Sequence, residues 1–168
     1  MRVLGLDPGL RATGWGLIEA GRGRLRFLEC GIVRPPLEGP LAVRLLALHE
    51  ALAAVIAAHA PDRAAVEETV VNLNAASSLK LGQARGVVLL AAARAGLEVA
   101  EYAARTVKRA VTGTGGAAKE QVASMVRALL PGARDAGADA MDALAVAICD
   151  AHHRATRLRL AAALEPPR

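Results

Sequence analysis

The sequence contains very little cysteine: Cys30 and Cys149 are its only two, and neither lies in a CxxC pair or near paired histidines. A structural zinc site or a disulfide framework is therefore not supported. Long apolar runs are also missing, because no stretch without a charged residue approaches the roughly 18 residues that a membrane span needs. Asp7 interrupts the short apolar run at the N-terminus, so we expect no signal peptide. These absences predict a soluble cytoplasmic protein.

Linkers and internal repeats are absent from the sequence as well. With 168 residues and 54% hydrophobic content, the chain is long enough to bury one well-packed core. We therefore expect a single domain over residues 1–160. The last residues, 161–168, contain the pair Pro166-Pro167 and are expected to form a frayed tail.

Lysine is scarce, since only three of the 21 basic residues are lysines, yet the chain is strongly basic. Its net charge is +5 and its pI about 10.0, which favours an anionic partner. Residues 103–134 contain six cations and one acid, Glu120. Two of the three lysines, Lys108 and Lys119, lie in this stretch, which hints at a need for a compact ammonium charge there. A solvated surface in an arginine-rich protein explains the same charges equally well.

The pattern of apolar and polar residues predicts an α/β fold. Strands are expected at 2–6, 14–19, 24–33, 63–67 and 97–102, and helices at 41–59, 75–95, 104–111, 117–130 and 138–160. The first three strands follow one another as hairpins, and the remaining strands alternate with helices. This order predicts a mixed sheet of five strands, flanked by helices on both faces.

Four acidic residues stand at the ends of buried elements: Asp7, Glu67, Asp139 and Asp142. Asp7 and Glu67 each end a short apolar run that is predicted to be a strand. Asp139 and Asp142 are three apart at the start of an apolar helix, which places both side chains on one face. Carboxylates in such places are costly unless a cation lies among them. Oxygen ligands of this kind suit Mg²⁺ or Mn²⁺.

Two of these acids also have a simpler explanation. Asp7 precedes a Pro-Gly pair, and Asp commonly begins a turn. Asp139 could merely complement the positive end of a helix. Asp142 is harder to dismiss, because its neighbours in the helix are apolar. Glu68 points to the opposite face of the strand from Glu67, so only one of the two can join the cluster.

Two further patterns favour ordinary structure over a binding site. Residues 113–118, Gly-Thr-Gly-Gly-Ala-Ala, match a loose GxGxxA dinucleotide pattern, but a basic helix and not a buried strand precedes them. A flexible loop is the better interpretation, and its glycines would let backbone N–H groups approach a phosphate. His152 and His153 follow Asp150 near a polar helix end, where we expect exposed histidines rather than metal ligands.

Several motifs together resemble the RuvC family, the Holliday junction resolvases of bacterial recombination. They are residues 4–16 (LGLDPGLRATGWG), 65–68 (AVEE), 78–86 (SLKLGQARG), 101–105 (EYAAR) and 138–145 (ADAMDALA). The resemblance extends from residue 3 to about residue 150 and implies a ribonuclease-H-like fold with an acidic cluster at one edge of the sheet. It also implies an endonuclease that nicks two strands of like polarity in a four-way DNA junction and leaves 5′-phosphates and 3′-hydroxyls.

The same resemblance implies the roles of the acids. Two Mg²⁺ ions, or Mn²⁺ in their place, would be held by Asp7, Glu67, Asp139 and Asp142. Asp7 would anchor both ions, and Glu67 rather than Glu68 would face them. Some family members carry His where this chain has Asp139, so an oxygen ligand is expected at that position here.

A DNA-binding surface and a dimer are implied as well. Lys119 would contact the scissile phosphate and Lys108 the flanking backbone. The remaining expected DNA contacts are Arg105, Arg109, Lys80, Arg85 and Val70. Val70 stands where members often carry an aromatic residue, so stacking on a base is not available, although an apolar wedge is. The second predicted helix would form a homodimer through Gly82 and Gly86, whose spacing of small residues permits close approach.

A branch-migration helicase and its junction-binding protein, of the RuvB and RuvA types, are the implied protein partners. Two other classes of protein remain open at this point. Actin-like ATPases and sugar kinases also begin with an apolar strand, Asp and Gly, but they need two such domains around the nucleotide, whereas 168 residues hold one. A junction-binding protein without catalysis would not need four acids.

Overall fold

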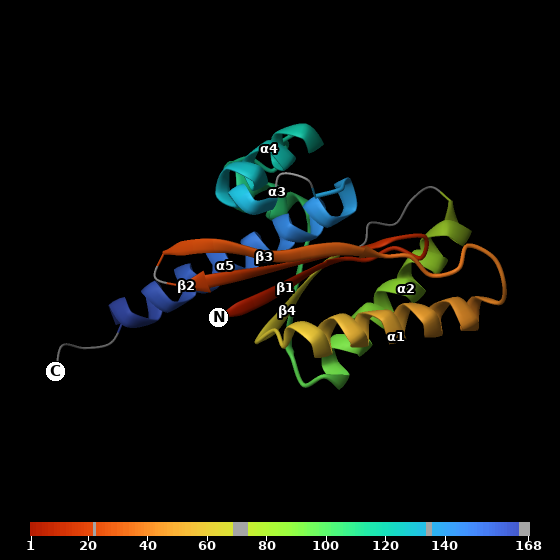
Figure 1. Cartoon of the computed structure of the whole chain (residues 1–168). Helices are drawn as coiled ribbons and strands as arrows, with labels where there is room; N and C mark the ends of the chain where they lie inside the picture. The colour runs from red at the N-terminus through yellow and green to blue at the C-terminus, as the bar shows by residue number, and fades with distance from the viewer. Residues whose placement is uncertain (22, 69–73, 134–135, 165–168) are drawn as a thin grey trace.

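A computed structural model describes residues 1–21, 23–68, 74–133 and 136–164 of the chain. Its centre is one five-stranded sheet (Figure 1). The strands are β1 (Arg2–Asp7), β2 (Thr13–Gly21), β3 (Arg24–Val33), β4 (Arg63–Glu67) and β5 (Glu98–Tyr102). Their order is β3-β2-β1-β4-β5; β2 is antiparallel to both β1 and β3, and β4 is parallel to both β1 and β5. The predicted strands and the mixed sheet are therefore confirmed.

Helices cover both faces of this sheet, as predicted. They are α1 (Leu41–His59), α2 (Ala75–Arg94), α3 (Ala104–Thr112), α4 (Lys119–Leu129) and α5 (Ala138–Leu164), and a short 3-10 helix, η1 (Pro131–Ala133), follows α4. In Figure 1, α1 and α2 lie on one side of the sheet, and α3, α4 and α5 lie on the other. Side chains of β1 alternate between the two cores: Leu4 and Leu6 pack with α1 and α2, whereas Val3 packs with α5.

Helix α5 lies directly on the backbone of the first two strands because glycines face it. A Cβ atom at Gly5 would overlap the carbonyl oxygen of Ala143, and one at Gly14 would overlap the carbonyl oxygen of Asp139. Glycine inside a strand commonly marks such a close approach of two backbones. The approach brings the first turns of α5 to the end of the sheet at which β1 ends.

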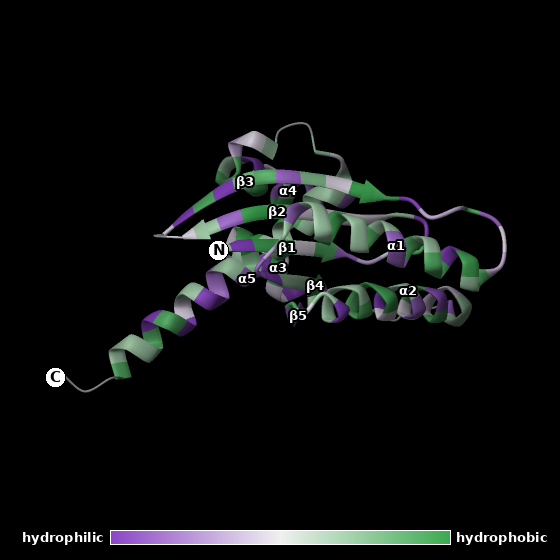
Figure 2. Ribbon diagram, turned by 60° about the horizontal axis from the view of Figure 1, so that its bottom comes forward, coloured by the Kyte–Doolittle hydropathy of each residue, from purple (hydrophilic) through white to green (hydrophobic). Residues whose placement is uncertain are grey.

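Helix α5 is also longer than the sequence predicted. It continues through Leu164, so the expected frayed tail over 161–168 is wrong for residues 161–164. Alanine and leucine fill these positions, and both are strong helix formers, so the helix continues without support from the sheet. Figure 2 shows this last part projecting away from the rest of the molecule. Helix α4 begins at Lys119, two residues later than predicted, with Ala118 as its N-cap.

Helix α1 has the length and apolar composition of a membrane span. Within the described chain its apolar residues have another role, because Leu48, Leu52 and Ile56 are buried in the core that α1 shares with the sheet and α2. The helix also carries the charged residues Arg44 and Glu50. These features favour an amphipathic helix that packs on the sheet.

Candidate active site

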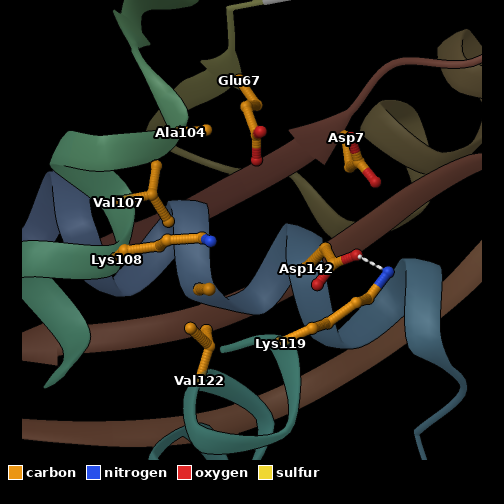
Figure 3. A pocket seen from close by; sticks show the side chains of 9 residues that line it. Asp7, Glu67, Ala104, Val107, Lys108, Lys119, Val122 and Asp142 are labelled. Atoms are coloured by element: carbon orange, nitrogen blue, oxygen red, sulfur yellow. Dashed lines mark ion pairs between the residues drawn. The ribbon is translucent and has the colours of Figure 1, made fainter. Parts of the chain in front are cut away.

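The predicted acids come from three elements that meet at one end of the sheet. Asp7 is the last residue of β1, and Glu67 is the last residue of β4. These strands are parallel neighbours with Leu6 opposite Val66, so both carboxylates lie at the same end of the sheet. Asp142 approaches them from α5. Figure 3 shows these three side chains around one cavity.

The cavity between the acids has a volume of about 180 Å³. Its polar lining consists of Asp7, Glu67, Asp142, Lys108 and Lys119, and its apolar wall consists of Ala104, Val107, Val122 and Ala145. Asp139 does not line the cavity, but its charge raises the pKa of Asp7, so it lies within electrostatic reach. The structure therefore brings three of the predicted acids into the cavity and places the fourth beside it.

Burial and mutual repulsion change the acidity of these groups. The pKa of Asp7 rises from 3.8 to about 7, because burial removes water from its carboxylate and because Glu67, Asp142 and Asp139 carry like charges. The pKa of Glu67 is also raised, mainly by burial and next by the charge of Asp142. A cation bound among the carboxylates would relieve this repulsion.

Two lysines line the same cavity. Lys119 is the first residue of α4, and its Nζ atom lies 2.7 Å from Oδ2 of Asp142. The hydrogen bond to Asp142 and the charge of that carboxylate raise the pKa of Lys119, so the ammonium stays charged at neutral pH. The Lys119 side chain is nevertheless 60% exposed, which leaves it open to a ligand. Lys108 reaches the cavity from α3, and its ammonium points toward the acids in Figure 3.

The donor chemistry of the cluster fits a hard divalent cation, since each acid offers carboxylate oxygens. Within the described residues, no three side chains of His, Cys, Asp or Glu are grouped closely enough to ligate one ion as they stand. Asp142 is already engaged in an ion pair with Lys119. The chemistry of the site therefore points to a cation, and Asp7, Glu67 and Asp142, which line the cavity, are the acids that would hold it.

The remaining DNA contacts predicted from the sequence differ in their surroundings. Arg105, Arg109 and Lys80 are all exposed. Arg85 forms an ion pair with Glu101 of β5, so its charge is already offset within the chain. Val70 lies outside the described residues. Among these residues, the exposed cations fit a role in DNA binding better than Arg85 does.

The two glycines predicted at a dimer interface, Gly82 and Gly86, are exposed on α2. A Cβ atom at either position would meet no described atom within 4 Å, so packing inside the chain does not require glycine there. Leu79 and Leu90 of the same helix are 66% and 52% exposed. A surface of small and apolar residues suits contact with a second copy, and the dimer stays a prediction.

Two expectations for residues outside the cavity have different outcomes. Glu68 is exposed, as predicted. His153 is also exposed, and its ring lies 5.3 Å from that of Tyr102. His152 is half-buried, with Nδ1 3.0 Å from the carbonyl oxygen of Ala110, so the predicted exposure is wrong for this residue. The contact between α3 and α5 accounts for its burial.

Sequence reasoning missed two features that position the acids. Gly14 lies opposite Asp7 in the sheet register and admits the backbone of Asp139. Arg63 and Asp150, with side chains 2% and 0% exposed, form an ion pair between β4 and α5, with Nε 2.8 Å from Oδ2. A glycine within a predicted strand was a usable signal for the first feature. Nothing in the sequence marked the ion pair.

Comparison with known proteins shows the family to which this chain is related. The sequence matches the family described as "Crossover junction endodeoxyribonuclease RuvC" over residues 3–150. A curated relative with that description, from Paramagnetospirillum magneticum, is 63% identical over 164 residues, which cover 98% of this chain and 99% of the relative. The solved structure of T. thermophilus RuvC in complex with a Holliday junction substrate is 35% identical, with a TM-score of 0.85, and the match covers 94% of this chain and 96% of that one.

More distant structures share the fold alone. The yeast mitochondrial Holliday junction resolvase Ydc2 is 8% identical, with a TM-score of 0.70, over 94% of this chain and 82% of that one. The family match includes the acids from Asp7 to Asp142 and both lysines of the cavity. The expected ribonuclease-H-like fold is confirmed, and the chain belongs to the RuvC family of crossover junction endodeoxyribonucleases, the Holliday junction resolvases.

Proposed function

We propose that this chain resolves four-way DNA junctions by metal-dependent cleavage of two strands of like polarity. The observation that supports this most strongly is the grouping of acids from β1, β4 and α5 with two lysines around one cavity, in a chain of the RuvC family. Hydrolysis of a phosphodiester needs an activated water and positive charge near the phosphate, and this cavity offers groups for both. The products would be 5′-phosphate and 3′-hydroxyl ends.

The acids would hold two divalent ions, Mg²⁺ or Mn²⁺. Asp7 is the proposed common ligand, because the charges of the other three acids all act on it. Glu67 and Asp142 would complete one position and Asp139 would support the other. Ions held in this way would supply an activated water and would neutralise negative charge on the leaving oxygen. The contribution of the chain is to present the carboxylates from two strand ends and a helix whose positions the core fixes.

Lys119 is the residue proposed to act on the scissile phosphate. Its ion pair with Asp142 holds a positive charge beside the acids. A phosphate entering the cavity would compete for this ammonium, which would then stabilise the negative charge that develops in the transition state. Lys108, which reaches the cavity from α3, would hold the backbone of the flanking DNA.

A homodimer would match the approximate two-fold symmetry of a four-way junction and place two active sites on it. The exposed face of α2 that carries Gly82 and Gly86 is the proposed interface. A branch-migration helicase and its junction-binding protein, of the RuvB and RuvA types, are the proposed partners. The cytoplasm is the proposed location, since the DNA substrate of bacterial recombination lies there.

Incubation of end-labelled four-way DNA with the protein and Mg²⁺ or Mn²⁺ tests this function. We expect two nicks at symmetric positions whose products DNA ligase can seal, because ligation needs a 5′-phosphate beside a 3′-hydroxyl. Linear duplexes of the same sequences should stay intact, and EDTA should stop cleavage without preventing binding. Binding without cleavage in either metal would favour a junction-binding protein without catalysis. ATP hydrolysis in place of cleavage would favour the actin-like ATPase class.

A further inference from the structure

A second cavity, lined by basic side chains, lies beyond the turn between β1 and β2. Its volume is about 380 Å³. Its polar lining consists of Arg11 from the turn, Arg44 from α1, and Ser77 and Lys80 from α2. No acidic residue of the described chain lines this cavity, which we call the basic pocket. It therefore has the opposite charge character to the cavity that holds the acids.

Arg44 is the fixed element of the basic pocket. Its Nε atom donates a hydrogen bond to the carbonyl oxygen of Pro36 at 2.6 Å, and its Nη2 atom donates one to the carbonyl oxygen of Leu10 at 3.2 Å. Both acceptors are neutral, so the guanidinium is held in place but its charge is not compensated. The Nη1 group and the second Nη2 hydrogen remain to bind a ligand.

Two further cations share the pocket with this arginine. Arg11 and Lys80 are exposed, and the ion pairs found among the described residues include neither of them nor Arg44. Three positive side chains therefore converge on one cavity without a carboxylate to neutralise them. Such a site has a strongly positive potential and favours an anion. A guanidinium presents paired N–H groups that match the oxygens of a phosphate.

The turn gives the basic pocket a fixed position relative to the acids. Arg11 follows Asp7 by four residues. Thr13 closes the turn, because its hydroxyl donates to the carbonyl oxygen of Gly9 at 2.7 Å and accepts from the backbone N–H of the same residue at 3.1 Å. Helices α1 and α2, which contribute the other cations, cover the face of the sheet opposite α5 (Figure 1). One tight turn therefore separates the acidic cavity from the basic pocket.

We propose that the basic pocket binds a backbone phosphate of the cleaved strand close to the scissile phosphate. This inference rests on the proposed nuclease function. A DNA strand that presents one phosphate to the acids continues with further phosphates at regular spacing, and a path over the turn leads to Arg11 and Arg44. Lys80 was already expected to contact DNA; the pocket adds the two arginines and gives all three cations one ligand. Its role is positioning, because a phosphate held there determines which neighbouring phosphate lies at the acids.

Arg11→Gln and Lys80→Gln test the pocket, because both side chains are exposed and neither supports the turn. Arg24→Gln is the matched control, since it removes an equally exposed arginine from the start of β3. Binding to labelled four-way DNA is measured in EDTA by fluorescence anisotropy at several salt concentrations. We expect each pocket variant to bind roughly three- to tenfold more weakly, with a salt slope lower by about one, and the control to bind as the wild type does.

Junctions that carry one neutral methylphosphonate at a time locate the contact. At the phosphate that the pocket holds, the methylphosphonate weakens binding of the wild type, and it weakens binding of Arg11→Gln by a smaller factor, because the variant has already lost part of the same interaction. At every other position the two losses add. Losses that add at all positions around the cleavage site, or wild-type affinity of both pocket variants, would overturn the assignment.

Light scattering and cleavage separate this inference from its alternatives. A change of oligomeric state in the pocket variants would place the pocket at a protein interface, and the inference would be wrong. Failure of the wild type to cleave junctions with either metal would remove the proposed function. Normal cleavage by the wild type together with unchanged pocket variants would remove only the role of the basic pocket.

Discussion

Replacement of Asp7 by asparagine should change how stability depends on pH, in addition to abolishing cleavage. The pKa of this carboxyl group is about 7 in the folded chain, against an ordinary value of 3.8. The folded state therefore binds the proton more tightly than the unfolded state does. The stability that this proton contributes is fully present below about pH 4 and is lost as the pH rises through about 7.

The structure sets the size of the effect. The two pKa values differ by about three, which corresponds to roughly 4 kcal/mol. Salt screens part of the repulsion from the other acids, so we expect a loss of about 2–4 kcal/mol between pH 4 and pH 8. Asparagine does not ionise and avoids this loss. Without metal at pH 8, Asp7→Asn should melt roughly 5–15 °C above the wild type, because about 1 kcal/mol shifts the midpoint of a chain of this size by about 2–4 °C.

Melting curves from pH 4 to pH 8, recorded in EDTA by circular dichroism, measure this difference. Glu50→Gln is the control, because it removes a charge from an exposed position on α1 and should leave the wild-type profile unchanged. Added Mg²⁺ should stabilise the wild type at pH 8 and have little effect on Asp7→Asn. Junction binding by the variant should be intact or stronger. Parallel profiles for wild type and variant would refute the argument from burial and repulsion, and cleavage at the wild-type rate would refute the role of Asp7.

Three further predictions concern the lysines, the glycine under α5 and the proposed dimer. Lys119→Ala should lower the cleavage rate roughly 10²–10³-fold even at saturating DNA, whereas higher enzyme concentration should largely restore the cleavage rate of Lys108→Ala. Single-turnover rates at several enzyme concentrations test this difference, and equal rescue of both variants would contradict it. Gly14→Ala should displace the first turn of α5 and lower the cleavage rate roughly tenfold or more, while junction binding persists. The control Gly21→Ala, where a Cβ atom meets open space, should cleave normally, and equal rates for the two variants would contradict this prediction. Gly86→Glu should fold, because the space around this position within the chain is open. The variant should be monomeric by light scattering and should convert a supercoiled cruciform into nicked circles. Linear product from a dimeric variant would show that this face is not the interface.

The strands and helices were largely predictable because local apolar patterns determine them. The run that ends at Glu67 is apolar at every interior position, as a strand buried on both faces requires, and it forms β4. The end of α5 was not predictable from such a pattern. Residues 161–164 are exposed, so no apolar pattern marks them as part of a packed helix, and Pro166-Pro167 suggested an earlier end to the helix. Intrinsic helix propensity decided the outcome there.

The members of the acidic cluster were predictable, but their arrangement was not. Carboxylates at the ends of apolar runs made Asp7 and Glu67 candidates, and the resemblance to the RuvC family selected Glu67 over Glu68. The 2.7 Å ion pair between Lys119 and Asp142 depends on where α4 begins relative to α5, which no local pattern records. The basic pocket was beyond prediction for a related reason. Its cations come from three distant segments, and backbone carbonyls of two loops hold Arg44 in place.

The acids cost the folded state stability, and the elements that carry them are held in register by other means. Asp7 and Glu67 end the central strand and its parallel neighbour, and α5 lies on the glycine backbone of β1 and β2. At the far end of the same contact, Arg63 pairs with Asp150, which also accepts a hydrogen bond from the hydroxyl of Tyr102 at 2.9 Å. A buried ion pair adds little net stability, but separation of its partners leaves uncompensated buried charges and costs about 3–5 kcal/mol. Repelling carboxylates could otherwise lower their energy by sliding the helix along the strands. Because the ion pair and the glycine contacts oppose that movement, the repulsion persists in the absence of the proposed cation.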